Sequence, residues 1–195
     1  MSVAPIGYPR PPLTVAQYAA LPEDSDTKFE LQEGSLVISP RPTRRHQLFI
    51  GRLFAELDRQ APPHLSVAPD VDVDLGLDGS GGPGFVRAPD LVVSTAEEAA
   101  RVDREGGFLR AAEVVLVVEV LSPGSRRTDS VVKLGEYAEA GIPHYWIVDL
   151  DDQPSVRVLL LTDGTYAQAG VFAGAVDLTD PFPVRFDLAL LAGRL

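Results

Sequence analysis

Hydrophobic and polar positions along the chain follow two different periods, which predicts a mixture of helices and strands. Leucine and phenylalanine recur at helical spacing between Thr43, a candidate N-cap, and Pro62. Strict alternation of valine and aspartate over residues 71–75 is typical of a half-buried strand. The run 114–121 is valine and leucine with a single polar residue, which predicts a strand buried on both faces.

Cap and turn signals divide the chain into intermixed helices and strands. The expected helices are 15–21, 43–60, 95–102 and 129–140. The expected strands are 28–32, 35–38, 65–75, 85–90, 91–93, 113–121, 144–150 and 156–161, followed by short strands and an apolar turn at 188–191. The strand–helix–strand unit over 113–150 favours a single α/β domain with a mixed sheet. We expect this domain to span residues 14–195, after an N-terminal extension of residues 1–13.

Glu119 is the polar residue that interrupts the most apolar strand. An isolated ionised carboxylate in that setting would cost several kcal/mol. Protonation, pairing with a cation or binding to a metal would each remove that cost. All three options are closer to chemistry than to packing, so Glu119 is the first candidate functional residue.

Asp90 and Lys133 form a constellation with Glu119. Asp90 stands at the start of a predicted strand, and Lys133 lies in the first turns of the helix after Glu119. If the two strands are neighbours, both carboxylates converge on one divalent ion, and Mg²⁺ needs only a few hard oxygens besides water. Such an ion polarises a phosphoryl oxygen and acidifies a water, and a lysine nearby orients that water or stabilises the developing charge. Asp129, Lys133 and Tyr137 are four residues apart, which places them on one helix face.

Composition narrows the class of protein. The chain has no cysteine and is 45% hydrophobic, which indicates a globular protein without disulfides or thiolate sites. Its net charge of −11 argues against tight non-specific binding to nucleic acid. Arginines cluster within residues 41–59, as either a solvated helix face or a surface that follows phosphates. We find no signal peptide and no membrane-spanning run, and we therefore expect a cytoplasmic protein.

An ordered set of motifs carries a family resemblance. The motifs are Ala88-Pro89-Asp90-Leu91-Val92-Val93, Val117-Val118-Glu119-Val120-Leu121-Ser122-Pro123, the trio Asp129, Lys133 and Tyr137, Gly141–Asp149, and upstream Phe29–Gly34 and His46. This set covers roughly residues 14–160. It resembles the Uma family of restriction endonucleases, a former domain of unknown function, within the PD-(D/E)xK nuclease superfamily.

The resemblance implies a restriction-endonuclease-like fold, in which helices flank a mixed central β-sheet. It implies that Asp90 and Glu119 are ligands of Mg²⁺ (or Mn²⁺), and that Glu30, which matches the family's upstream acid, completes the metal shell. The usual lysine of the superfamily stands two residues after the acid, where this chain has Leu121. Lys133 is the matching candidate, one helical segment downstream.

The expected function is therefore metal-dependent phosphodiester hydrolysis, with DNA as substrate and Asp90, Glu119 and Lys133 as catalytic residues. Fold analogy predicts a homodimer, with strand 144–150 and the C-terminal segment as contact surface. The alternative is a catalytically degenerate protein that keeps the fold for binding or assembly, which the acidic charge and the missing motif lysine favour. A third hypothesis is a metal hydrolase of a small phosphate substrate. His46 is interpreted as a helix-surface residue and Tyr137 as a packing residue.

Overall fold

The computed structural model describes residues 11–22, 29–38, 42–79, 81–122, 131–151 and 153–193. Its largest sheet has six strands in the spatial order β11–β10–β9–β8–β6–β3. In that order the strands are Thr165–Ala173, Ser155–Thr162, His144–Asp149, Val114–Val120, Leu91–Thr95 and Leu65–Pro69. Only the β8–β9 pair is parallel, and the other pairs in this sheet are antiparallel. The predicted fold class, a mixed sheet with flanking helices, is confirmed.

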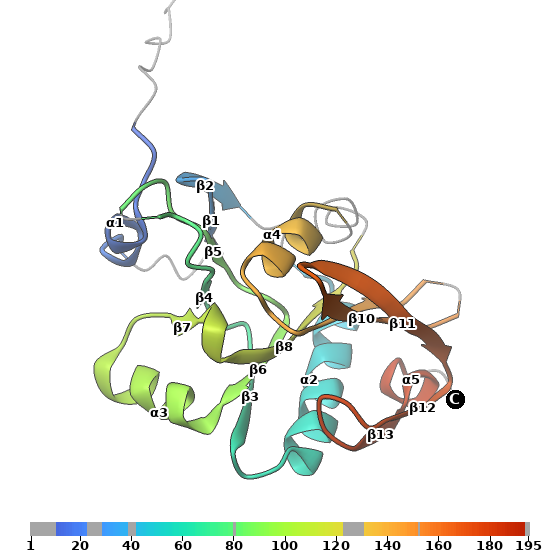
Figure 1. Ribbon diagram of the computed structural model, residues 1–195. Coiled ribbons are helices and arrows are strands. Elements are labelled where there is room, and N and C mark those ends of the chain that lie inside the picture. Colours follow the sequence, from blue (N-terminus) through green and yellow to red (C-terminus); the bar gives the residue numbers. More distant parts are fainter. Residues whose placement is uncertain are drawn as a thin grey trace, which may run out of the picture.

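Smaller sheets and five α-helices complete the described part of the chain (Figure 1). A five-stranded sheet has the order β2–β1–β5–β4–β7, with strands Ser35–Ile38, Phe29–Gln32, Val86–Arg87, Val73–Asp74 and Leu109–Arg110. A third sheet pairs β12 with β13, which are Ala175–Leu178 and Val184–Asp187. The helices are α1 Val15–Ala19, α2 Arg44–Gln60, α3 Ala96–Glu105, α4 Lys133–Glu139 and α5 Leu188–Leu191, and a 3₁₀ turn covers Ala111–Glu113. None of the helices in the described ranges is long and apolar enough to cross a membrane.

Strand β8 separates two hydrophobic cores, because its successive side chains point to opposite faces of the sheet. Val118 and Val120 pack in the core that includes Phe49 of α2. Val117 packs in the other core, which includes Tyr137 of α4. Helices α2 and α4 accordingly lie on different sides of β8 (Figure 1). Glu119 alternates with Val118 and Val120, so its side chain belongs to the α4 side.

The pairing register carries the two predicted acids to the same end of the sheet. Leu91 at the start of β6 pairs with Val118 of β8 in an antiparallel ladder. One step beyond that pair, the same register sets Asp90 opposite Glu119. The assumption behind the predicted metal pair, that these two strands are neighbours, is therefore correct.

Two of the expected elements differ from the structure. The strand expected over 65–75 is divided between β3 and β4, which belong to different sheets. The chain breaks at Asp70, whose φ of 56° lies in the left-handed region and ends the extended run. Likewise the segment after residue 162 forms the nine-residue strand β11, because Asp163 and Gly164 with positive φ make a tight hairpin turn from β10.

The contact surface expected for a homodimer is also wrong in its main part. Strand β9 lies between β8 and β10, and its Tyr145 and Trp146 are 0% exposed. Its aromatic side chains fill the two cores and are not available to a second copy. The homodimer itself stays a prediction.

Helix α2 is anchored to the sheet by Phe49, which is fully buried. Truncation by Phe49→Ala should lower the free energy of unfolding by about 3–5 kcal/mol, because it removes a ring and leaves a cavity. The adjacent Leu48, which is 40% exposed, supplies the control, and Leu48→Ala should cost about 0.5 kcal/mol or less. Urea unfolding followed by the fluorescence of Trp146 measures both values. Equal losses would contradict this packing of α2.

Candidate functional site

The candidate site lies where the end of β8 meets the start of β6, helix α2 and helix α4. The structure brings all four predicted site residues into this region: Asp90, Glu119, Lys133 and Glu30. It also brings in His46, Arg87, Glu136 and Tyr137. All eight side chains are linked, directly or through the backbone of β8, by the hydrogen bonds and ion pairs described below.

Asp90 is held by the backbone of the strand beside it. Its Oδ2 accepts a hydrogen bond of 2.7 Å from the backbone N–H of Val120 and lies 3.2 Å from Nε2 of His46. Val120 lies beyond the pairing end of β6, so the carboxylate takes the place of a ladder acceptor. The Asp90 side chain keeps 16% of its surface exposed, against 5% for Glu119. It is therefore the more solvent-accessible of the two predicted ligands.

His46 is buried and belongs to the site, so its interpretation as a helix-surface residue is wrong. Its Nε2 lies 2.9 Å from the carbonyl oxygen of Val120. In the β6–β8 register the residue opposite Val120 is Pro89, which has no N–H to donate. His46 supplies the missing donor, and since a carbonyl only accepts, Nε2 carries the proton.

The neighbours of His46 also set its charge. Burial alone would lower the pKa of His46, but the hydrogen bond and negative charge of Asp90 outweigh it, so the pKa is raised above its ordinary value. Nδ1 of the same ring is buried, with no hydrogen-bond partner among the described residues. The ring is thus fixed through Nε2 alone, between the two oxygen acceptors that flank it.

Glu119 is paired with a cation in the structure, which answers the question raised by its position in an apolar strand. Its Oε1 accepts 2.8 Å from Nζ of Lys133 and 2.9 Å from the hydroxyl of Tyr137. Tyr137 is fully buried, and burial together with the charge of Glu119 raises the pKa of its phenol well above the ordinary value. Tyr137 therefore stays neutral and acts as a donor, and it is part of the site rather than a packing residue alone.

Lys133 reaches Glu119 because helix α4 packs on the face of the sheet toward which Glu119 points. Residues 117, 119 and 121 share that face, and Leu121 packs against the same core as Tyr137. A lysine at position 121 would extend from the strand toward Glu119, whereas the side chain of Lys133 extends toward Glu119 from the helix that covers the strand. The lysine is only 5% exposed, and its ammonium is bonded to Glu119 and to Glu30. Its expected proximity to Glu119 is correct.

Glu30 of β1 enters the site as a partner of Lys133. Its Oε1 lies 3.0 Å from Nζ of Lys133 and accepts 3.1 Å from the N–H of Ala88. Its Oε2 accepts 3.1 Å from Arg87. Burial would raise the pKa of Glu30, but Lys133 and Arg87 more than offset it and lower the pKa below its ordinary value. Glu30 is thus ionised and both of its oxygens have protein donors; its role as a metal ligand stays a prediction.

Arg87 and Glu136 were missed by the sequence reasoning. Arg87 is 0% exposed and grips both carboxylate oxygens of Glu136 on α4, at 2.6 and 2.8 Å. The rule that singled out Glu119, a charge inside an apolar strand, applies equally to Arg87 between Val86 and Ala88. Glu136 shares its helix face with Lys133, three residues earlier.

The charges of this network test whether a divalent ion fits. The carboxylates of Glu30, Glu119 and Glu136 pair with two permanent cations, Arg87 and Lys133, and the carboxylate of Asp90 lies beside His46. With the carboxylates ionised, the network keeps an excess of negative charge whether His46 is neutral or protonated, because four carboxylates outnumber the cations in either state. Within the described residues, no group of three or more His, Asp or Glu side chains is placed to hold a metal. Such an arrangement does not fit an all-protein cage, but it fits Mg²⁺, which is usually bound by one or two carboxylates with water and substrate oxygens.

The arginines of segment 41–59 mostly bind within the protein. Arg45 donates to the carbonyl of Leu150, Arg52 to the carbonyl of Leu191, and Arg59 to Glu56. The first two bonds fix α2 to its neighbours, and the Arg59–Glu56 bond lies within α2. All three weaken the hypothesis of a phosphate-following surface there. Arg41 and Asp129, as well as Arg126 and Arg127, lie outside the described residues.

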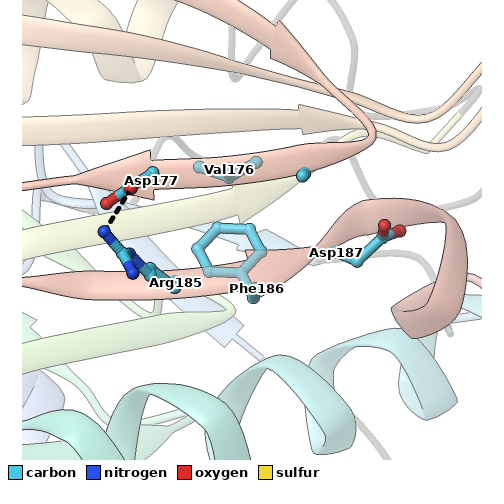
Figure 2. A pocket seen from close by; sticks show the side chains of 6 residues that line it. Val176, Asp177, Arg185, Phe186 and Asp187 are labelled. Atoms are coloured by element: carbon cyan, nitrogen blue, oxygen red, sulfur yellow. Dashed lines mark ion pairs between the residues drawn. The ribbon is translucent and has the colours of Figure 1, made fainter.

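An open hollow of about 420 Å³ lies elsewhere, between β12 and β13 (Figure 2). Val176 and Phe186 line it together with Asp177 and Arg185, which form an exposed ion pair of 2.8 Å. None of the predicted site residues lines this hollow. The chemistry of the described residues is therefore concentrated in the buried network and not in this depression.

The structural role of His46 has a measurable consequence. The substitution His46→Ala removes the hydrogen-bond donor to the Val120 carbonyl. Pro89, which lies opposite Val120, has no N–H that could take its place. The free energy of unfolding should fall by about 1–3 kcal/mol, the cost of an unsatisfied buried acceptor. Gln47→Ala, at the next and exposed position, should change it by about 0.5 kcal/mol or less. Urea titration measures the free energy of unfolding of both variants. Equal losses would contradict the role of His46 as the donor to Val120.

Comparisons with known proteins show the family and agree with the fold. The family model Uma2, described as "Putative restriction endonuclease", matches residues 15–191. A crystal structure described as a putative nuclease belonging to DUF820 from Anabaena variabilis ATCC 29413 matches with a TM-score of 0.67 at 17% identity, covering 94% of this chain and 99% of that one. At that identity the likeness shows the fold. No protein with curated annotation matches. Because the family model spans nearly the whole chain, the protein belongs to the Uma2 family.

Proposed function

We propose that the protein is a metal-dependent DNA endonuclease, which hydrolyses phosphodiester bonds with a water activated by Mg²⁺ (or Mn²⁺). The observation that carries the proposal is the buried Lys133–Glu119 pair of 2.8 Å, with Asp90 opposite Glu119 in the β6–β8 register. Membership of a family described as restriction endonucleases supports the reaction class. The excess negative charge of the network supports a divalent cation beside it.

Five residues of the site have a role in this reaction. Asp90 and Glu119 would hold the ion, which when bound polarises the scissile phosphate and acidifies a water. The ammonium of Lys133, beside Glu119, would orient the attacking water or stabilise the negative charge that develops on the phosphoryl oxygens. Tyr137 fixes the Oε1 of Glu119, and His46 fixes the Oδ2 of Asp90. Positioning of this kind lowers the barrier because the groups need not reorganise during the reaction.

The acidic charge of the protein shapes its encounter with DNA. With a net charge of −11, the chain repels a polyanion at long range. We therefore propose weak binding that is carried by contacts at the site, including the ion, rather than by a broad basic surface. Affinity should then depend on the divalent ion more than on monovalent salt.

A catalytically degenerate protein that acts in binding or assembly is the second candidate. The specific observation that favours it is the occupation of the site by protein donors, with both oxygens of Glu30 and Oε1 of Glu119 already paired. The absence of a lysine at position 121 favours it too. A protein of this kind would keep the ion pairs for shape and would cut neither DNA nor small phosphodiesters. Activity on small phosphodiesters alone would instead favour the third hypothesis.

A homodimer remains part of the proposal, with its contact surface in the C-terminal segment and not on β9. Strand β11 forms an edge of the six-stranded sheet and carries no charged residue over Thr165–Ala173. Val171 on this strand is 57% exposed. In a chain with strong net negative charge, an uncharged edge strand is where a second copy meets least repulsion. Two β11 strands would pair antiparallel across a two-fold axis.

Cleavage of DNA tests the catalytic assignment. Purified protein with Mg²⁺ or Mn²⁺ should nick or cut plasmid DNA, and Asp90→Asn should lower the rate on the order of 10²-fold or more, since it removes a charge on which the transition state depends. Glu119→Gln and Lys133→Met should act in the same direction. Asp177→Asn, which changes an exposed acid on β12, is the matched control and should cut like the wild type. If Asp90→Asn and Asp177→Asn cut equally well, the assignment is wrong.

Metal binding is a separate prediction that does not require turnover. Calorimetric titration of the protein with Mn²⁺ should show one site, because two carboxylates with excess negative charge attract a single divalent ion. The site should disappear in Asp90→Asn and weaken strongly in Glu119→Gln, and it should persist in Asp177→Asn. A wild type that takes up no Mn²⁺ would favour the degenerate alternative.

A further inference from the structure

Arg87 is the most deeply buried charged side chain of the described residues, and no part of the proposed reaction uses it. It lies in β5, next to the β1 strand that carries Glu30. Its guanidinium donates to Oε2 of Glu136 through Nε at 2.6 Å, to Oε1 of Glu136 at 2.8 Å, and to Oε2 of Glu30 at 3.1 Å. A cation that is removed so completely from water must be compensated by these three oxygens.

The two cations of the network divide the glutamate oxygens between them. Arg87 binds both oxygens of Glu136 and one oxygen of Glu30. Lys133 binds the other oxygen of Glu30 and Oε1 of Glu119. In this division Arg87 bonds Glu136 and not Glu119, whereas Lys133 bonds Glu119 and not Glu136. Lys133 and Glu136 nevertheless lie about one turn apart on α4.

Without Arg87, the glutamate oxygens would no longer be shared between two cations. The single ammonium of Lys133 would then face three carboxylates: those of Glu30 and Glu119, which are buried, and that of Glu136, whose side chain is 12% exposed. Glu136 is on the same helix face as Lys133, and an intrahelical pair needs no alignment of α4 with the sheet. An unpaired buried carboxylate is costly, so the ammonium would be drawn toward Glu136 and away from Glu119.

We propose that Arg87 is a positioning residue: by binding Glu136 and one side of Glu30 itself, it keeps the ammonium of Lys133 on Glu119. The flat guanidinium suits this task because it forms parallel bonds to both oxygens of one carboxylate and still has a donor for a second. Its consequence for DNA cleavage rests on the proposed function. The placement of Lys133 does not, and it can be measured whether or not the protein cuts DNA.

The chain is well suited to this measurement, since it has only two lysines, Lys28 and Lys133. In a Lys28→Arg background, protein labelled with ¹⁵N-lysine carries one side-chain ammonium. A buried ammonium held by hydrogen bonds exchanges slowly with water, so its resonance is observable. The shift of this resonance on Glu119→Gln reports whether Lys133 is bonded to Glu119. The fluorescence of Trp146 verifies folding for each variant.

We expect Glu119→Gln to shift the Lys133 resonance when Arg87 is present, and the shift to be lost in Arg87→Met. It should return in Arg87→Met combined with Glu136→Gln, because the competing carboxylate is gone. Arg101→Met is the matched control. Arg101 grips the buried Glu98 with two bonds of 2.8 and 2.9 Å, on α3. This variant should leave the Glu119→Gln shift unchanged.

Arg87→Lys decides the case if Arg87→Met does not fold. This variant keeps the positive charge but loses the flat guanidinium with its parallel donors. The ammonium resonance that is absent from the spectrum of the Arg87 protein belongs to the new lysine. The Glu119→Gln shift should be reduced in this variant, because an ammonium does not hold Glu136 and Glu30 together as a guanidinium does. A full shift in Arg87→Lys, or in a folded Arg87→Met, would overturn the proposal. So would a folded double variant with no recovery. A wild type that fails to cut DNA would count against the proposed function and leave this result standing.

Discussion

The ammonium of Lys133 is the point at which three parts of the protein meet. It bonds Glu119 from the six-stranded sheet and Glu30 from the five-stranded sheet, and it is carried by α4. Buried ion pairs of this kind contribute little net stability, since apolar residues of similar volume often serve as well or better. Removing one partner is far more damaging, because a buried charge is left alone. Because the network contributes little net stability and tolerates little change, a chemical function accounts for its presence better than folding does.

The lysine of this site comes from a helix, and the alternation of the strand explains why this is possible. Position 121 lies on the same face of β8 as Glu119, and it is the position from which a strand lysine would reach the acid. Leu121 packs there against the core under α4. Because α4 covers that same face, a lysine in its first turn points to the same place from the opposite direction. The two arrangements deliver one ammonium to one carboxylate through different parts of the backbone.

Sequence patterns predicted what depends on local periodicity. The valine-rich run predicted β8, and the charge within it predicted that Glu119 would be paired or bound. The proximity of Asp90 and Glu119 was expected only on the condition that their strands are neighbours, and the register that sets them opposite each other was not predicted. The division of residues 65–75 at Asp70 was not predicted, because alternation continues on both sides of a residue whose left-handed backbone has no distinct signature.

Long-range partners were the least predictable features. His46 donates to Val120 because Pro89, 43 positions along the chain, stands opposite Val120 and has no N–H to donate. No local pattern encodes that compensation. Arg87 was visible in principle as a charge in an apolar strand, yet its partner Glu136 lies on a helix whose packing only the tertiary structure defines. Strand β9 shows the converse, since its aromatic residues suggested a surface and are instead divided between two cores.

A crystal structure of the protein soaked with Mn²⁺, with anomalous scattering recorded for the ion, tests the central claim most directly. The account predicts one anomalous peak between the carboxylates of Asp90 and Glu119, with Lys133 still bonded to Glu119 beside it. A saturating soak that leaves this position without a peak, or that places the ion away from both carboxylates, would contradict it.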